Sequence, residues 1–159
     1  MFAVVLSRAS VFVVHTVKRK LCSEVKTVLF RGVDPSHVDY SDALQGIVRP
    51  SQARLSEKQG KKFPCFEDRS MEELFDVAED HHHSSRSATG SPFTSWTRSK
   101  EVAKHYAGTT GVILTATVGK EIEKCFPSPN DWGEDEILVY GSVRNAALYP
   151  KEPVNNRNE

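Results

Sequence analysis

Runs of β-branched and aromatic residues divide the chain and predict several short strands. They lie at Val28–Phe30, around Ser95, along the segment GVILTATV, and from Ile137 towards Gly141, where apolar or small residues recur at every second position. Arg31 and Gly32 follow the first run directly. Because glycine commonly interrupts a strand, we expect Arg31 to stand at the strand's end.

Two helices are predicted from spacing and stop signals. Ser70 stands three residues before Glu73, which is the spacing of a capping box at a helix N-terminus. The apolar positions that follow share one helical face, and they are Met71, Leu74, Phe75 and Ala78. We expect this helix to end near the histidines of HHHSSRSATG. A shorter helix is predicted in SHVDYSDALQGIVRP, where Gly46 and Pro50 would stop it.

The segment SPFTSWTRSKEVAKHYA predicts a strand, a hydroxyl-bearing turn and a helix in succession. The strand carries Ser95, and Thr97 or Ser99 can cap the helix that follows. Its apolar stripe consists of Val102, Ala103, Tyr106 and Ala107. Two other segments lack a regular pattern, so we expect loops in SQARLSEKQGKKFP and in GKEIEKCFPSPNDWG.

Charge and cysteine content exclude several classes of protein. The 159 residues contain 21 basic and 21 acidic side chains, so net charge gives no argument for a general nucleic-acid or membrane-surface role. A chain of this length is most simply one domain. The cysteines, Cys22, Cys65 and Cys125, show no CxxC spacing, which indicates neither a disulfide framework nor a zinc knuckle and fits a reducing compartment.

The first 24 residues are an extension whose role the sequence leaves open. The apolar run is interrupted by Arg8 and Ser10 and is too short for a spanning helix, and the basic cluster at 18–20 follows the run instead of preceding it. This order does not fit a secretory signal. An organelle transit peptide, an ordinary N-terminal helix or strand, and a mis-called start all remain open.

Two acids precede the last predicted strand in the stretch GEDEILVYG. In an extended segment, residues two apart point to the same side, so Glu134 and Glu136 would project together while Asp135 faces away. On their own, a carboxylate pair at a strand edge and an arginine after a strand are usually solvent-exposed surface residues.

Taken in order, three segments resemble a known enzyme family. LFRG, then SPFTSWT followed by a helix, then EDEILVYG, resemble the arginine, serine and glutamate motifs of ADP-ribosyltransferases of the cholera-toxin-like class. The motifs span about residues 29–143, and Glu134 with Glu136 matches the family's E-x-E variant. The chain departs from the usual Ser-Thr-Ser at Ser95-Trp96-Thr97, where only the first serine is clearly retained.

This resemblance implies an α+β fold with a split β-sandwich core and flanking helices. Residues 25–150 would form the catalytic domain, between the extension 1–24 and a polar tail 151–159. The implied activity is mono-ADP-ribosyl transfer from NAD, as substrate, to an acceptor with release of nicotinamide and without a metal. Protein arginine is the default acceptor, while nucleic-acid bases and small molecules remain open. We expect a monomer.

The resemblance also implies roles for individual residues. The catalytic set would be Glu136 at the ribose, Glu134 at the acceptor, and Ser95 orienting the glutamate or contacting the ribose. Contacts to NAD would come from Arg31, Gly32, Ser95, Thr97 and His83. Arg31 would bind pyrophosphate oxygens, so Arg31→Lys should weaken NAD binding and leave thermal stability nearly unchanged. Trp132 or Phe126 would present an aromatic ring to the acceptor, although Trp96 and Trp132 could equally be packing residues.

The three consecutive histidines are not expected to form a metal site. Neighbours on a helix differ by about 100° in direction, so His81, His82 and His83 cannot converge on one ion. By the resemblance, His82 or His83 would contact NAD. Alternatively, the histidines simply end a helix, where a protonated imidazole interacts favourably with the helix dipole.

Two other functions remain open: an NAD glycohydrolase, and a catalytically inactive module that binds NAD or a partner. The sequence also leaves the location open between the cytoplasm and delivery as a toxin-like effector.

Overall fold

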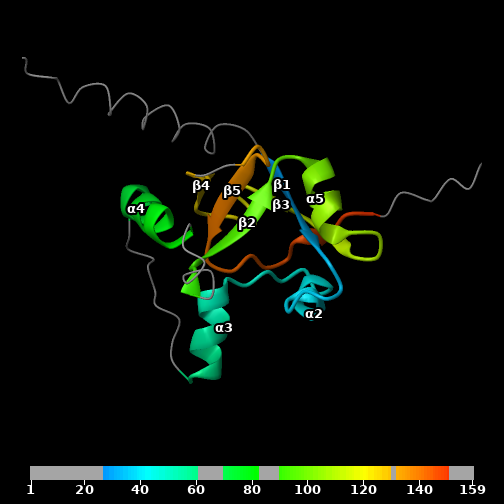
Figure 1. Cartoon of the computed structure of the whole chain (residues 1–159), viewed down its shortest axis with the longest axis horizontal. Coiled ribbons are helices and arrows are strands. Elements are labelled where there is room, and N and C mark those ends of the chain that lie inside the picture. The colour runs from blue at the N-terminus through cyan, green and yellow to red at the C-terminus, as the bar shows by residue number, and fades with distance from the viewer. Residues whose placement is uncertain (1–26, 61–69, 83–89, 130–131, 151–159) are drawn as a thin grey trace, which may run out of the picture.

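A computed structural model of the chain describes residues 27–60, 70–82, 90–129 and 132–150 (Figure 1). The predictions for the extension 1–24, the tail 151–159, Cys22, Cys65 and His83 lie outside these residues. The choice among His81, His82 and His83 as an NAD contact therefore stays a prediction.

The described strands form one six-stranded antiparallel sheet. Its strands are β1 (Val28–Val33), β2 (Phe93–Thr97), β3 (Val112–Thr117), β4 (Cys125–Pro127), β5 (Glu136–Tyr140) and β6 (Ala147–Leu148). Their order across the sheet is β4-β5-β2-β1-β3-β6, so β1 and β2 lie at the centre although about 60 residues separate them in sequence. With the helices described below, this confirms the α+β class.

The sheet consists of two halves that meet at its centre. Strand β1 is registered with β3 along its whole length, from Val28 opposite Thr117 to Val33 opposite Val112. Strand β2 is likewise registered with β5, from Phe93 opposite Tyr140 to Thr97 opposite Glu136. Between β1 and β2 the only registered pair among the described residues is Phe30 with Thr97. We call this short contact between β1 and β2 the central seam.

Four described helices surround the sheet: α2 (Tyr40–Ala43), α3 (Ser51–Lys58), α4 (Met71–His82) and α5 (Lys100–Ala107). Figure 1 shows α4 beside the half formed by β2, β4 and β5, and α5 beside the half that contains β1 and β3. Leu74 and Ala78 of α4 pack with Phe93, Phe126 and Leu138 in one hydrophobic cluster. The larger cluster draws on strands of both halves, and it includes Leu29, Val33, Trp96, Leu114 and Ile137.

Local sequence signals place two of the helices correctly. The capping box of α4 is confirmed, because the Glu73 backbone N–H donates to Ser70 Oγ over 3.2 Å and the Ser70 N–H donates to the Glu73 carboxylate over 2.7 Å. The Ser99 side chain accepts from the Val102 N–H and caps α5. The predicted short helix is also present as α2, and Gly46 after it adopts a φ of +70°.

Other predictions from the pattern are wrong. The expected loop SQARLSEKQGKKFP begins with helix α3, which buries none of its residues and therefore shows no apolar stripe. The expected loop before Glu134 contains the short strand β4. Arg31 does not end its strand, because β1 continues through Gly32 to Val33.

Candidate functional site

A cavity of about 650 Å³ opens along the central seam. It is bounded by β1 and the turn after it, by β2, by α5, and by the residues at the start of β5. Arg31, Ser95, Glu134 and Glu136 all line it. Its volume lies within the range of roughly 300–1,000 Å³ typical of small-molecule sites.

Arg31 bridges the two central strands by its side chain. Its Nη1 donates a hydrogen bond of 2.6 Å to the carbonyl oxygen of Ser95 on β2. Among the described residues, β1 and β2 are registered only at Phe30 and Thr97, so few backbone hydrogen bonds join the two strands. The Arg31 side chain adds a hydrogen bond across this contact. Arg31 therefore holds the seam in addition to facing the cavity, and its replacement should also cost stability.

The environment of the Arg31 guanidinium is largely dry. Burial lowers its pKa, the Asp39 carboxylate acts against this, Arg54 adds to the lowering, and Glu136 again opposes it. Among the described residues its Nε is buried without a hydrogen-bond partner. A partly buried cation at a cavity wall is an environment in which an anionic ligand would be stabilised.

Gly32 lies against the backbone of α5. A Cβ at this position would stand 1.9 Å from the Ala103 carbonyl oxygen and 2.6 Å from the Ala107 nitrogen. Only glycine allows helix and strand to approach so closely. Gly32 also lines the cavity, but its structural role is to let α5 pack onto β1.

Ser95 and Thr97 project from the central strand to the cavity. Thr97 Oγ1 donates to the Glu134 carbonyl oxygen over 2.7 Å and accepts from the Ser99 N–H over 2.9 Å. The third position of the serine motif therefore connects β2 to the start of α5 and to the turn that carries Glu134. Both of these hydrogen bonds join the Thr97 hydroxyl to other groups of the protein.

Glu134 and Glu136 lie in the same cavity, but strand alternation is not the reason. Strand β5 begins only at Glu136, and the residues on either side of Glu134 have positive φ, +86° at Gly133 and +50° at Asp135. Glu134 thus stands in a tight turn, and Asp135 points away to pair with Arg98 over 2.7 Å. The two acids lie in one cavity as the sequence predicts, but a turn, and not an extended strand, places Glu134 there.

Tyr106 is a cavity residue that the sequence pattern assigned to the apolar stripe of α5. The side chain is 51% exposed, lines the cavity, and donates a hydrogen bond of 2.7 Å from its hydroxyl to Glu134 Oε1. This bond raises the pKa of Tyr106 to about 12, because the carboxylate favours the protonated hydroxyl, and burial adds to the shift.

The turn after β1 forms another wall of the cavity, and its residues were not among the predicted site residues. Asp34, Ser36 and His37 line the cavity, and the Asp34 carboxylate accepts from the Ser36 N–H over 2.8 Å and from its hydroxyl over 2.7 Å. The Ser36 contacts lower the pKa of Asp34. The dipeptide Asp34-Pro35 followed by Ser36 is a turn signal, which could have indicated this wall.

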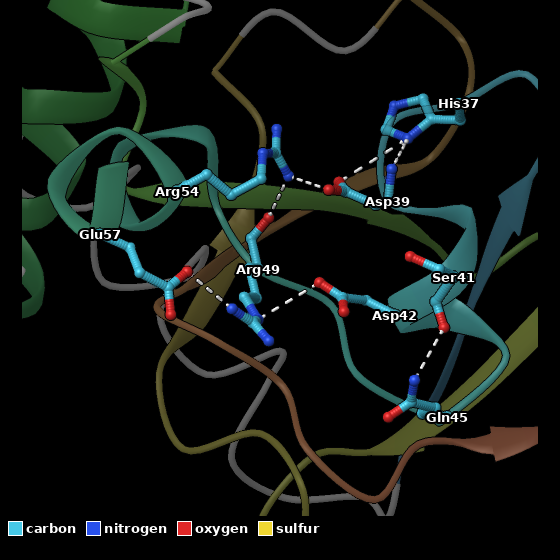
Figure 2. A network of polar contacts seen from close by, with 8 residues as sticks. All are labelled: His37, Asp39, Ser41, Asp42, Gln45, Arg49, Arg54 and Glu57. Carbon is cyan, nitrogen blue, oxygen red and sulfur yellow. Dashed lines mark hydrogen bonds and ion pairs between the residues drawn. The ribbon is translucent and has the colours of Figure 1, made fainter. Parts of the chain in front are cut away.

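A polar network lies behind His37 (Figure 2). Buried Asp39 forms an ion pair with Arg54, and its backbone N–H donates to His37 Nδ1 over 3.2 Å. Arg54 also donates to the carbonyl of Arg49 over 3.0 Å. The ion pair with Asp39 attaches helix α3 to the residue before α2. Because His37 Nδ1 accepts this hydrogen bond, the proton of the neutral ring resides on Nε2.

The aromatic residues predicted to face an acceptor differ from one another. Phe126 is only 7% exposed and packs its ring against Phe75 and Phe93, so it is a core residue and the prediction for it is wrong. Trp132 is 91% exposed but does not line the cavity. Trp96 is buried and its indole N–H donates to Thr94 Oγ1 over 3.0 Å, which makes it a packing residue.

Other features of the described residues do not compete with this site. A second cavity, of about 700 Å³, is lined by charged side chains of both signs from α3 and from residues 120–124, and it contains none of the predicted site residues. Within the described ranges no group of three histidine, cysteine or acidic side chains could hold a metal ion. No described helix has the length and apolar character needed to cross a bilayer.

Comparison with protein-family models, with curated proteins and with solved structures finds no match to this chain. The assignment of function therefore depends on the geometry of the cavity and on the three sequence motifs.

Proposed function

We propose that the chain is a mono-ADP-ribosyltransferase that uses NAD and transfers ADP-ribose to an acceptor, by default a protein arginine. The observation that carries the proposal is the convergence of Arg31, Ser95, Glu134 and Glu136 on one cavity. These residues come from three segments that are distant in sequence, and they are the ones that the resemblance singles out.

The form of the sheet supports the finer fold assignment. The family has a split β-sandwich, and here the two three-stranded halves share one registered pair at the central seam within the part of the chain that the structure describes. The cavity lies at this opening. Arg31 and Ser95, which stand on the two facing strands, are brought together by the bond between the Arg31 side chain and the Ser95 carbonyl.

The proposed reaction breaks one bond and forms another at C1′ of the nicotinamide ribose. The bond from C1′ to the nicotinamide nitrogen breaks, and its electron pair leaves with neutral nicotinamide. The acceptor nitrogen forms the new bond to C1′ and loses a proton to a base. Positive charge grows on the ribose during this exchange, so a carboxylate beside it lowers the barrier. We assign this role to Glu136.

Glu134 would then serve the acceptor by taking its proton, while Ser95 contacts the ribose or orients Glu136. The Arg31 guanidinium would attract the pyrophosphate of NAD, since it is a partly buried cation that lines the cavity. One of its donors is already engaged by Ser95, so the phosphate contact would use the remaining edge of the group.

The test is nicotinamide release and protein labelling by purified chain with labelled NAD and a cell lysate. We expect Glu136→Gln to reduce both signals by about 100- to 1,000-fold, because the transition-state charge loses its partner. Its unfolding midpoint should stay near that of the wild type.

Asp135→Asn is the matched control, since it makes the same carboxylate-to-amide change one residue away on a side chain that faces Arg98. It should leave both signals unchanged. Full turnover by folded Glu136→Gln would remove the assignment of this residue. Nicotinamide release by the wild type without labelling would indicate a glycohydrolase, and the absence of both signals would indicate an inactive module.

A further inference from the structure

The position of the Glu134 carboxylate depends on helix α5. The Tyr106 hydroxyl donates to Glu134 Oε1 over 2.7 Å, across 28 positions of sequence. Tyr106 itself stands on a fixed support, because Ser99 caps the start of α5 and the buried Ala103 and Ala107 press the helix onto Gly32 of β1. The bond therefore connects a glutamate in a turn to the rigid part of the sheet.

The main chain of Glu134 is fixed independently. Thr97 Oγ1 donates to the Glu134 carbonyl oxygen over 2.7 Å. Positive φ values at Gly133 and Asp135 define the turn on both sides. With the backbone fixed, the direction of the carboxylate is determined by the side-chain torsions, and the Tyr106 hydroxyl restricts those torsions.

Charge reinforces this contact at neutral pH. A tyrosine hydroxyl is protonated at neutral pH at its ordinary pKa, and the contact with the Glu134 carboxylate raises the pKa of Tyr106 further, to about 12. The hydroxyl therefore remains a donor, and a bond from a hydroxyl to a carboxylate is of the stronger, charge-assisted kind.

We propose that Tyr106 is a positioning residue that holds the Glu134 carboxylate where an acceptor nucleophile must lose its proton, and thereby favours transfer over hydrolysis of NAD. This inference rests on the proposed function. Water is small and can approach C1′ in several orientations, whereas a bulky acceptor depends on a base that is already in place. Loss of the hydroxyl should therefore reduce transfer more than hydrolysis.

The test compares Tyr106→Phe with the wild type for lysate-protein labelling and for nicotinamide release without lysate. We expect labelling to fall about 10- to 100-fold, the size of effect that follows from a misplaced reacting group. Nicotinamide release in the absence of acceptor should change less than threefold, and the KM for NAD should not change, because in this proposal the Tyr106 hydroxyl acts only through Glu134.

Tyr149→Phe is the matched control. The Tyr149 ring lies against Phe30 and under Lys100, but no hydrogen bond of its hydroxyl is found within the described part of the chain. This variant should retain the wild-type ratio of transfer to hydrolysis. If Tyr106→Phe also retains that ratio, or if it reduces both activities equally, the inference is wrong.

A second measurement tests the contact without any turnover. In the protein labelled at tyrosine ¹³Cζ, the resonance that disappears in Tyr106→Phe belongs to Tyr106, and its chemical shift should differ between the wild type and Glu134→Gln at the same pH. A resonance that is insensitive to Glu134 would overturn the inference while leaving the transferase proposal standing. A wild type that releases no nicotinamide, or one that releases nicotinamide but labels no protein, overturns the transferase proposal and the inference with it.

Discussion

Strand β1 has two neighbours, and it is held to them in different ways. On one side, a continuous backbone ladder joins β1 to β3 from Val28 to Val33. On the other side, the central seam has one registered pair, and the Arg31 side chain bonds to the Ser95 carbonyl. Strand β1 is thus paired along its whole length with β3, whereas its sparse pairing with β2 leaves room for the cavity.

The difference shows how a sheet can contain a site without losing its core. Backbone hydrogen bonds are independent of side-chain identity, so the contact with β3 tolerates many sequences. At the central seam one specific guanidinium supplies the bridging bond, and its desolvation is the condition that would attract an anion. We therefore expect substitutions that disturb the packing around β1 and β3 to unfold the chain. Substitutions at the central seam should affect stability and ligand binding together.

The largest effect is expected for Gly32→Ala. The new methyl group would meet the backbone of Ala103 and Ala107, which can move only if α5 lifts from β1. We expect a loss of about 3 kcal/mol in the free energy of unfolding, measured by urea denaturation. Gly90→Ala is the control, because an added Cβ there meets no atom within 4 Å. Equal stability of the two variants would contradict the close packing of α5 on β1.

A smaller effect is expected for Arg31→Lys. An ammonium cannot reproduce the geometry of the bond to the Ser95 carbonyl, so we expect a loss of about 1.5 kcal/mol in unfolding free energy. NAD binding, followed by calorimetry, should weaken in the same variant. Arg98→Lys should change stability by less than about 0.5 kcal/mol, since its pair with Asp135 is exposed. If Arg31→Lys is as stable as the wild type but binds NAD more weakly, Arg31 acts on the ligand and does not stabilise the central seam.

The smallest effect concerns His37 at the wall beside the seam. Burial lowers its pKa below 6.5, Asp39 opposes this, Arg31 and Arg54 add to it, and Asp34 opposes it. Between the lowered value and 6.5 the unfolded chain binds more protons, so the contribution of neutral His37 to stability is lost as the pH falls through this window.

Melting temperatures measured from pH 7.5 to 5.5 should show this loss, and part of it should vanish in His37→Gln. The difference should be small because the His37 side chain is 44% exposed. If the melting temperatures of the two proteins change with pH in the same way, the His37 ring does not affect stability between its lowered pKa and pH 6.5.

Local signals in the sequence predicted those parts of the fold that depend on near neighbours. The capping box at Ser70 and the cap at Ser99 involve contacts three residues apart, and both form as expected. Helix α3 was missed because it has no buried face and is anchored by ion pairs, Arg54 with Asp39 and Arg49 with Glu57. Charged contacts between segments leave no periodic pattern to detect.

The candidate site was predicted in part for the same reason. The motifs named Arg31, Ser95, Glu134 and Glu136, and all four line one cavity. The bond from Tyr106 to Glu134 was invisible, because an aromatic residue in a helical stripe is usually a packing residue. The positive φ at Asp135 was also missed, since strand alternation assumes an extended backbone that the turn does not have.

The shortness of the outermost strands has a consequence for self-association. At the edges of the described sheet stand β4, with three residues ending in Pro127, and β6, with two residues. An exposed edge is a template on which another chain can add a strand, but proline offers no N–H and a two-residue strand offers few groups to pair. Edge-to-edge growth would gain little backbone bonding at either end, which protects a small sheet with an open centre from forming fibrils.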